Sequence, residues 1–251
     1  MTTASQLSLA LGIEAGDLVS LVGAGGKTTA ILTLVRELRS RNLRVLVTTT
    51  THLGSTIPSE VPSFLYGECG EGHLRDVLDE QGAILVAGPP DSDGKLTGLG
   101  GRIVGVLSSS LRADVTLVEA DGARKRSLKA PDAHEPVIPN GATIVCPVVG
   151  LDALGLPIGE AAHRPHLVAR FAPDGFVTVE AIAALLTSAL GALKGVPDDA
   201  SVRPILNKMG DRSSEAANIS AMVFAGTARI DRIVAGDIRE QRICVFARPG
   251  C

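Results

Sequence analysis

Apolar and polar residues follow two distinct patterns along this chain. Short runs rich in Val, Ile and Leu are typical of strands buried in a parallel sheet, and the segments between them repeat their apolar residues at helical spacing. The predicted strands span 18–22, 44–47, 83–86, 115–118, 143–147, 202–206, 230–234 and 243–246, and the predicted helices span 27–40, 72–80, 102–109, 178–193 and 213–224. This alternation predicts an α/β fold of three layers, in which helices cover both faces of a mostly parallel β-sheet.

The predicted helix 27–40 is amphipathic. Its charged residues Arg36, Glu37 and Arg39 fall on one face, and its apolar residues fall on the other. The apolar residues are Ala30, Ile31, Leu34, Val35 and Leu38. We expect this apolar face to lie on the sheet.

Length and composition fit a single domain spanning residues 1–251. The chain has 251 residues, of which 45% are hydrophobic, and this is enough for one large core. The segment at about residues 122–141 contains three prolines and four basic residues without periodicity. We expect it to form a long irregular loop beside a functional site.

Composition and charge argue against two classes of partner. Five Phe, one Tyr and no Trp leave few rings on which nucleic-acid bases could stack, and a net charge of -3 gives no general attraction for a polyanion. The longest uncharged apolar segment, 181–193, has about two-thirds of the length of a membrane-spanning helix. No basic residue precedes Lys27, so no secretory signal is predicted. We expect a cytoplasmic protein that binds neither nucleic acid nor membrane.

A glycine-rich turn stands between the first predicted strand and the first predicted helix. It consists of Gly23, Ala24, Gly25, Gly26, Lys27, Thr28 and Thr29. In a phosphate-binding loop, backbone N–H groups and a helix N-terminus surround the phosphates, a lysine reaches the outer phosphates, and a threonine or serine binds Mg²⁺. The full pattern GxxxxGK[ST] requires glycine at position 21, where this chain has Leu21, so only a shorter form is present.

This shorter loop makes the predicted fold P-loop NTPase-like. We expect it to bind a nucleoside triphosphate, either ATP or GTP, with Thr28 on Mg²⁺. The alternative is an ordinary turn that contains a surface lysine.

A threonine-rich segment follows the predicted strand 44–47. Four consecutive threonines and His52 stand at its carboxyl end, the edge at which open parallel sheets bind ligands. Hydroxyls such as those of Thr49 and Thr50 could bind Mg²⁺ or phosphate oxygens. The alternative is that threonine is present because it favours strands, and a single histidine such as His52 is more often structural than a ligand.

Two acidic residues, Glu119 and Asp121, follow the predicted strand 115–118. P-loop enzymes place at such a strand end the carboxylate that binds Mg²⁺ or polarises the attacking nucleophile. Alternation along an extended strand puts both side chains on one face. We therefore predict Lys27, Glu119 and Asp121 as catalytic residues, with Glu119 as a further Mg²⁺ ligand. A simple turn at Asp121–Gly122 is the alternative.

The irregular segment after Asp121 begins with a cluster of basic residues. The cluster consists of Arg124, Lys125, Arg126 and Lys129. Contact with phosphate or with an anionic substrate is one interpretation, and a solvated charged surface is the other. His134 and Glu135, which lie between two prolines, are candidates for substrate contact or for a general base.

The segment NKMGD follows the predicted strand 202–206 and is similar to the NKxD motif with which guanine-specific NTPases bind the base. Asn207 and Lys208 match that motif. Gly210 stands at the position of its aspartate, and Asp211 comes one residue later. A shift of the loop could restore the contact, so the segment favours GTP only slightly over ATP. A strand-ending turn is the alternative.

Taken together, these segments resemble the YqeC family over nearly the whole chain. The shared segments, in family order, are VGAGGKTT, VLVTTTTHL, LVEADGARKRSLKAPDAHEPVIP, VVGLDALGLPI, AHRPHLVA and VRPILNK. The third of these segments is the most specific. Family members usually have proline at the position of Ser127 and an intact NKxD, so this chain departs from the pattern at two places. The second departure weakens the case for guanine.

The resemblance implies a cytosolic P-loop NTPase that serves as an accessory protein of selenium-dependent molybdenum hydroxylases. Its partners would be a nucleoside triphosphate and a molybdenum hydroxylase, or the machinery that inserts the hydroxylase's cofactor. The resemblance also implies a second site, formed by Arg124, Lys129, His134, Glu135, His163 and Arg164. Two other functions stay open: a kinase or Mur-like ligase acting on a small anionic substrate, and a module that binds a nucleotide or nucleotide-bearing cofactor without hydrolysis.

Overall fold

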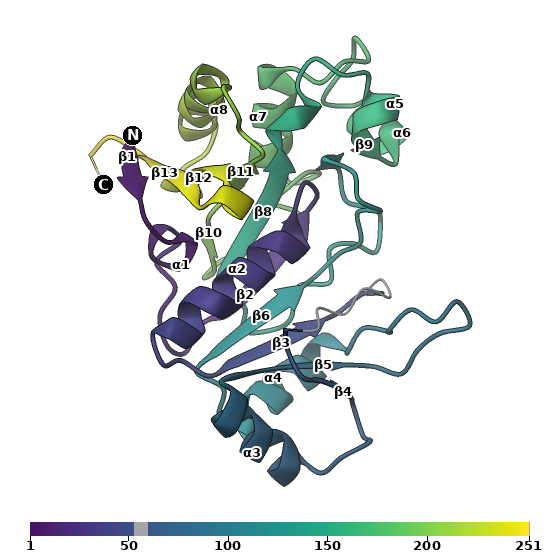
Figure 1. Ribbon diagram of the computed structural model, residues 1–251. Helices are drawn as coiled ribbons and strands as arrows, with labels where there is room; N and C mark the ends of the chain where they lie inside the picture. The colour runs from purple at the N-terminus through teal and green to yellow at the C-terminus, as the bar shows by residue number, and fades with distance from the viewer. Residues whose placement is uncertain (53–59, 251) are drawn as a thin grey trace.

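The computed structural model describes residues 1–52 and 60–250 (Figure 1). Within these ranges the strands of the main sheet are β1 (Thr2–Ala4), β2 (Leu18–Gly23), β3 (Val45–Thr49), β4 (Ser63–Leu65), β5 (Ala83–Ala87), β6 (Val115–Glu119), β8 (Ile144–Gly150), β10 (Ser201–Val202), β11 (Ile205–Asn207), β12 (Arg232–Asp237) and β13 (Arg242–Ala247). Their order is β1-β13-β12-β11-β8-β2-β6-β3-β5-β4, with β10 paired to β8. The pairs that β13 makes with β1 and β12 are antiparallel, and the other pairs are parallel.

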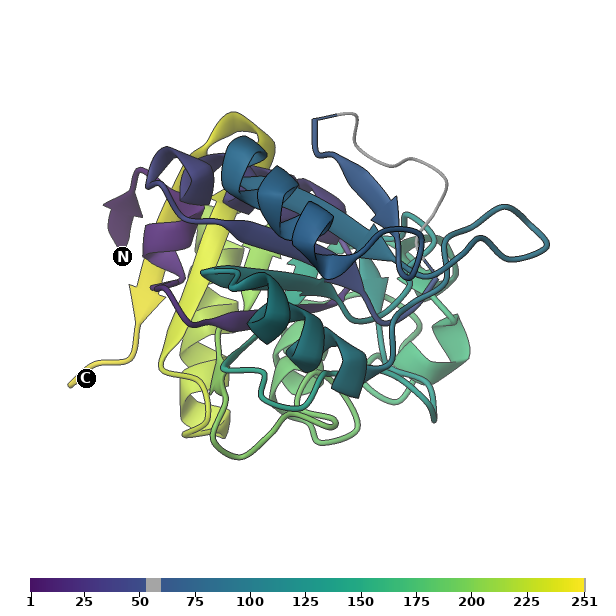
Figure 2. The same cartoon turned by 90° about the horizontal axis from the view of Figure 1, so that it is seen from below.

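Helices cover both faces of this sheet (Figures 1 and 2). The longer ones are α2 (Lys27–Ser40), α3 (Glu71–Gln81), α4 (Gly101–Leu111), α7 (Val179–Thr187) and α8 (Ser213–Gly226). Val19 of β2 packs with Leu34 of α2 in one apolar cluster, whereas Leu18 of β2 belongs to the cluster of α3 and α4 on the opposite face. The predicted three-layer α/β fold, in which helices cover both faces of a mostly parallel sheet, is therefore confirmed. None of the helices within the described ranges is long and apolar enough to cross a membrane.

The remaining elements are short. They are α1 (Leu7–Ala10), β7 (Leu128–Lys129), η1 (Leu151–Ala153), α5 (Ile158–Ala161), β9 (Ala162–His163), α6 (Pro165–Val168) and η2 (Ile238–Glu240). β7 and β9 pair in parallel, so that Lys129 lies opposite His163. This pair brings the irregular segment 122–141 against the segment that contains the AHRPH sequence.

Leu21, the position at which the full phosphate-loop pattern fails, belongs to strand β2. It is completely buried and lies in register with Glu119 of β6 and Cys146 of β8. The turn that follows is therefore a short loop that begins after the end of a buried strand.

Two predicted elements were wrong in extent. The predicted helix 178–193 ends at Thr187, and Ser188 is extended with φ -92° and ψ 138°. The predicted strand 202–206 divides into β10 and β11, both paired with β8. Pro204 lies at the division, where it has no backbone N–H to contribute to the ladder.

Glu37 is buried although it lies on the charged side of α2. Its Oε1 accepts a hydrogen bond from the Leu7 N–H at 2.9 Å, and its Oε2 accepts one from the Ser8 N–H at 2.6 Å. These are the first residues of α1, whose N–H groups have no acceptor within their own helix. The Glu37 carboxylate therefore caps α1 and fastens it to α2.

Replacing Glu37 with Ala is expected to lower the free energy of unfolding by about 1–3 kcal/mol, because two buried N–H groups lose their acceptor. The neighbouring Arg36→Ala variant is the control. Its guanidinium pairs with Glu60 on the surface, so its loss should change this free energy by less than about 1 kcal/mol. Urea unfolding followed by circular dichroism measures both variants, and equally small changes would contradict the capping role.

Candidate functional site

The glycine loop between β2 and α2 is pressed against two neighbouring strands. Gly25 and Gly26 have φ angles of +92° and +126°, which favour glycine. A Cβ atom on Gly25 would lie 2.1 Å from the Gly150 N atom, and one on Gly26 would lie 2.3 Å from Asn207 Nδ2. The loop therefore needs glycine at both positions, both for its conformation and for lack of space.

The backbone N–H groups of the loop fall into two sets. Ala24 donates to the Val148 carbonyl at 2.9 Å, and Gly25 donates to the Arg126 carbonyl at 3.0 Å. The N–H groups of residues 26–29 have no hydrogen-bond acceptor among the residues that the structure describes. They form the N-cap and first turn of α2, where the helix dipole also attracts negative charge. A phosphate group can bind there.

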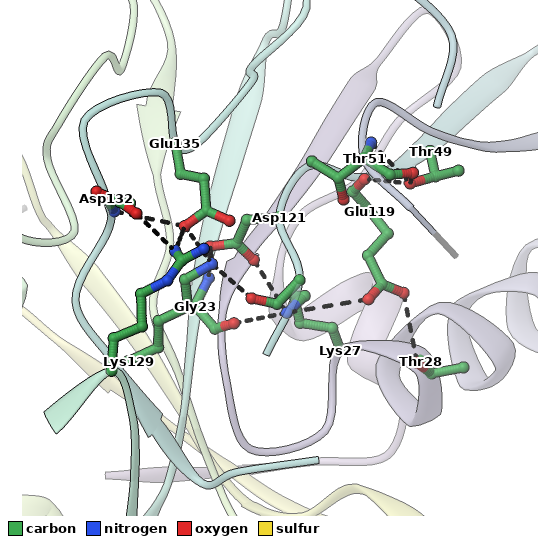
Figure 3. A network of polar contacts seen from close by, with 12 residues as sticks. Gly23, Lys27, Thr28, Thr49, Thr51, Glu119, Asp121, Lys129, Asp132 and Glu135 are labelled. Atoms are coloured by element: carbon green, nitrogen blue, oxygen red, sulfur yellow. Dashed lines mark hydrogen bonds and ion pairs between the residues drawn. The ribbon is translucent and has the colours of Figure 1, made fainter. Parts of the chain in front are cut away.

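Lys27 lies at the start of α2 and is only 4% exposed. Its Nζ is 3.0 Å from Asp121 Oδ1 and 3.9 Å from Glu119 Oε1, and it donates to the Gly23 carbonyl at 2.5 Å (Figure 3). Asp121 Oδ2 in turn accepts the Gly23 N–H at 2.9 Å. The structure thus brings the three predicted catalytic residues together.

A row of alternating charges continues from Asp121 into the irregular segment (Figure 3). Lys129 Nζ lies 3.2 Å from Asp121 Oδ2 and 2.8 Å from Glu135 Oε2. Arg164 Nη1 donates to the same Glu135 oxygen at 2.6 Å. We call this set the charge row; its members are Glu119, Lys27, Asp121, Lys129, Glu135 and Arg164. It joins three residues of the predicted second site to the phosphate loop.

The pKa values of the two glutamates of the charge row shift in opposite directions, although burial acts on both in the same way. Desolvation raises the pKa of Glu119 above its usual value of 4.5, and the charge of Lys27 offsets this only in part. Burial alone would also raise the pKa of Glu135, but the hydrogen bond from Lys129 and the charges of Lys129 and Arg164 lower it below its usual range. A further cation would therefore stabilise the ionised form of Glu119 more than that of Glu135.

The oxygen atoms around Glu119 fit Mg²⁺. The exposed Thr28 hydroxyl donates to Glu119 Oε2 at 3.3 Å, so a hydroxyl and a carboxylate stand together at the start of α2. Among residues 1–52 and 60–250, no group of three His, Cys, Asp or Glu side chains is arranged to hold a metal ion. Mg²⁺ commonly takes one or two protein ligands and completes its shell with phosphates and water. Thr28 and Glu119 suit such a site.

The threonines after β3 already have partners within the protein. Thr49 Oγ1 lies 2.9 Å from both the Thr51 and the Glu119 carbonyl oxygens, and Thr50 Oγ1 donates to the Val137 carbonyl at 2.6 Å. These hydroxyls fasten the end of β3 to β6 and to the irregular segment. Binding of Mg²⁺ by Thr49 and Thr50 stays a prediction.

Asn207 supports the phosphate loop. Its Nδ2 donates to the Gly25 carbonyl at 2.8 Å, and its Oδ1 accepts the Ile238 N–H at 3.1 Å. Both ends of the amide are thus used within the protein. Asp211 is exposed, and its carboxylate makes no hydrogen bond within the described part of the chain. Contact of Asn207 and Asp211 with a base stays a prediction.

Two aspartates that contact the NKMGD segment were not among the residues predicted from the sequence. Asp152 Oδ2 accepts a hydrogen bond from Lys208 at 2.9 Å, and Lys208 also donates to Ser127 Oγ at 2.8 Å. Asp237 accepts the Gly210 N–H at 3.1 Å. Both aspartates stand at the carboxyl ends of strands, so the rule that identified Glu119 could have found them.

The other predicted second-site residues lie around the outer end of the charge row. Arg124 and His134 are exposed, and His163 is half-buried. Burial lowers the pKa of His163, and the charges of Arg164, Lys129 and Arg124 lower it further. His52 is separate from this group: its exposed ring lies 3.4 Å from Asp91.

The opposite pKa shifts of Glu119 and Glu135 predict opposite effects on stability. Since the folded state disfavours ionised Glu119, Glu119→Gln is expected to be more stable than the wild type at pH 7, and the difference should shrink as the pH falls to about 4. Glu135→Gln is the matched control. Its ionised form stabilises the fold, so this variant should be less stable at pH 7, with the difference lost as the pH falls through the lowered pKa. Thermal unfolding in metal-free buffer measures both, and two shifts of the same sign at pH 7 would contradict the prediction.

Comparison with known proteins identifies related chains. The family model YqeC, described as YqeC protein, matches residues 19–166. The uncharacterized protein YqeC of Escherichia coli (strain K12) is 30% identical over 226 residues, which cover 88% of each chain.

Two solved structures of FtsY also match, with lower similarity. FtsY from Mycoplasma mycoides has a TM-score of 0.40 and 13% identity over 92% of this chain and 62% of its own. The signal recognition particle receptor FtsY from Elizabethkingia anophelis has a TM-score of 0.40 and 11% identity over 90% of this chain and 60% of its own. This chain thus spans about three-fifths of the length of the FtsY chains.

From the family model and the Escherichia coli relative, we conclude that the chain belongs to the YqeC family.

Proposed function

We propose that this chain binds and hydrolyses a Mg²⁺-bound nucleoside triphosphate, and that it does so as an accessory protein in the maturation of selenium-dependent molybdenum hydroxylases. The observation that carries nucleotide binding is the position of Lys27, an almost completely buried cation beside the N–H groups of residues 26–29. A lysine and a set of converging N–H groups are the two components that a phosphate loop requires.

In this proposal the residues around the loop have separate tasks. Mg²⁺ held by Thr28 and Glu119 would offset the negative charge of the phosphate oxygens. Lys27 binds the outer phosphates, and Asp121 fixes the direction of the lysine while it also holds the Gly23 N–H. Glu119 or Asp121 orients the water molecule that attacks the outer phosphate.

The role in hydroxylase maturation is supported by the family resemblance. The contacts of the irregular segment are compatible with such a role, because Lys129 and Glu135 connect the phosphate loop to Arg164, which is 32% exposed. A change at the nucleotide can therefore reach a surface available to a client protein.

Lys27→Ala is expected to weaken binding of Mg·ATP and Mg·GTP by about 10- to 100-fold, because the bound phosphates lose a charged hydrogen bond. Isothermal titration calorimetry with non-hydrolysable analogues measures the dissociation constants. The control is Lys95→Ala, since Lys95 pairs with Asp93 on the surface. Equal affinity of the Lys27→Ala variant and the wild type would exclude the phosphate loop.

Hydrolysis assays separate the proposed function from its alternatives. Slow basal hydrolysis that a selenium-dependent molybdenum hydroxylase accelerates supports the accessory role. Turnover only with a small anionic acceptor supports a kinase or a ligase. Retention of nucleotide without turnover under every condition supports a binding module.

The choice of base depends on Asp211. If its carboxylate accepts the N1 and N2 protons of guanine, the wild type should bind GTP more tightly than ATP, and Asp211→Asn should remove this preference while it leaves the affinity for ATP unchanged. Competition between GTP and ATP measures the ratio, with ATP as the internal control. A wild type without preference leaves Asp211 without a role in binding.

A further inference from the structure

Asp121 is shared by two buried lysines that come from different parts of the chain. Its side chain is 3% exposed, and the side chains of Lys27 and Lys129 are 3% and 0% exposed. Asp121 Oδ1 faces Lys27 at 3.0 Å, and Oδ2 faces Lys129 at 3.2 Å. Charges removed from water in this way are screened little, so each ion pair depends on the pairs beside it.

The row beyond Lys129 leads to the surface. Glu135 Oε2 lies 2.8 Å from Lys129 Nζ and 2.6 Å from Arg164 Nη1. The guanidinium of Arg164 also lies 3.4 Å from Asp132 Oδ2. With 32% of its side chain exposed, against 16% for Glu135, Arg164 is the most exposed member of the charge row beyond Lys129.

We propose that Lys129, Glu135 and Arg164 are positioning residues for the phosphate loop. Through Asp121 they determine how tightly Lys27 is held, and thereby the affinity of the loop for nucleotide. This inference rests on the proposed nucleotide binding by Lys27.

The direction of the effect follows from the alternation of charges. A phosphate group must compete with Asp121 for Lys27. If Arg164 is lost, Glu135 interacts more strongly with Lys129, and the ion pair between Lys129 and Asp121 becomes weaker. Asp121 in turn holds Lys27 more tightly, so nucleotide binding weakens.

Coupling of this kind is reciprocal, so nucleotide binding strengthens the contact between Glu135 and Arg164. A partner whose carboxylate or phosphate group captures Arg164 has the same effect as its removal. Such a partner promotes release of the nucleotide.

A double-mutant cycle at the outer end of the row tests this inference. Arg164→Gln should weaken binding of a non-hydrolysable, fluorescent Mg·nucleotide by about fivefold or more. In the Glu135→Gln background the same replacement should have no effect, because Arg164 is then disconnected from Lys129. Arg164→Lys, which keeps the charge, should retain most of the wild-type affinity. If the Arg164 charge acted on the nucleotide only by direct long-range attraction, its loss would weaken nucleotide binding equally in the wild-type and Glu135→Gln backgrounds.

The chain offers a matched control in Asp152. Its carboxylate lies near the phosphate loop, since a Cβ on Gly150 would be 2.5 Å from Asp152 Oδ1, but it pairs with Lys208 outside the charge row. In the Asp152→Asn background, Arg164→Gln should therefore keep its full effect. Loss of the effect in this background as well would overturn the inference. Thermal unfolding verifies that each variant is folded.

A measurement on the wild type does not depend on the variants. In side-chain NMR spectra, exchange of the Arg164 guanidinium protons should slow when nucleotide binds, and an unchanged rate would overturn the inference. Absence of nucleotide binding by the wild type would overturn the proposed function together with this inference. If the wild type binds nucleotide, but Arg164→Gln weakens binding equally in the wild-type and Glu135→Gln backgrounds, only this inference is overturned.

Discussion

The carboxylate of Asp121, held between Lys27 and Lys129, is the interaction on which the site depends. Each of these three groups is almost completely buried, and any one of them alone would be strongly destabilising in such a position. Together they compensate one another's charge, and they fix α2, the end of β6 and β7 in a single arrangement. The phosphate loop and the irregular segment are for this reason one structural unit.

This arrangement divides the surroundings of Asp121 into two sides. On one side lie the N–H groups of residues 26–29, the Thr28 hydroxyl and the incompletely compensated Glu119, which suit phosphate and Mg²⁺. On the other side lie Glu135 and Arg164, which carry the row to the surface. In the proposed role as an accessory protein, this link would connect the bound nucleotide to a surface that a client can contact.

The sequence was sufficient to predict most of the fold and the proximity of Lys27, Glu119 and Asp121. Periodicity identified β2, β3, β5 and β6 because their apolar runs are buried on both faces of a parallel sheet, and the carboxyl ends of such strands meet at one edge. That rule placed Lys27 beside Glu119 and Asp121 without knowledge of the strand order.

The remaining features depend on residues far apart in the chain. The contact between Gly25 and Gly150 follows from the pairing of β2 with β8, and the use of Asn207 to hold the loop follows from the position of β11. The end of α7 at Thr187 and the burial of Glu37 likewise depend on tertiary contacts, which local propensity does not contain.

Hydrogen exchange of the backbone amides of residues 26–29 tests the central claim most directly. These N–H groups have no acceptor within the described residues, so they should exchange rapidly in the free protein and slowly in the presence of a saturating, non-hydrolysable Mg·nucleotide. Protection of these amides on nucleotide binding is the predicted result. Unchanged exchange at residues 26–29, while nucleotide is bound, would contradict the claim that this loop binds the phosphates.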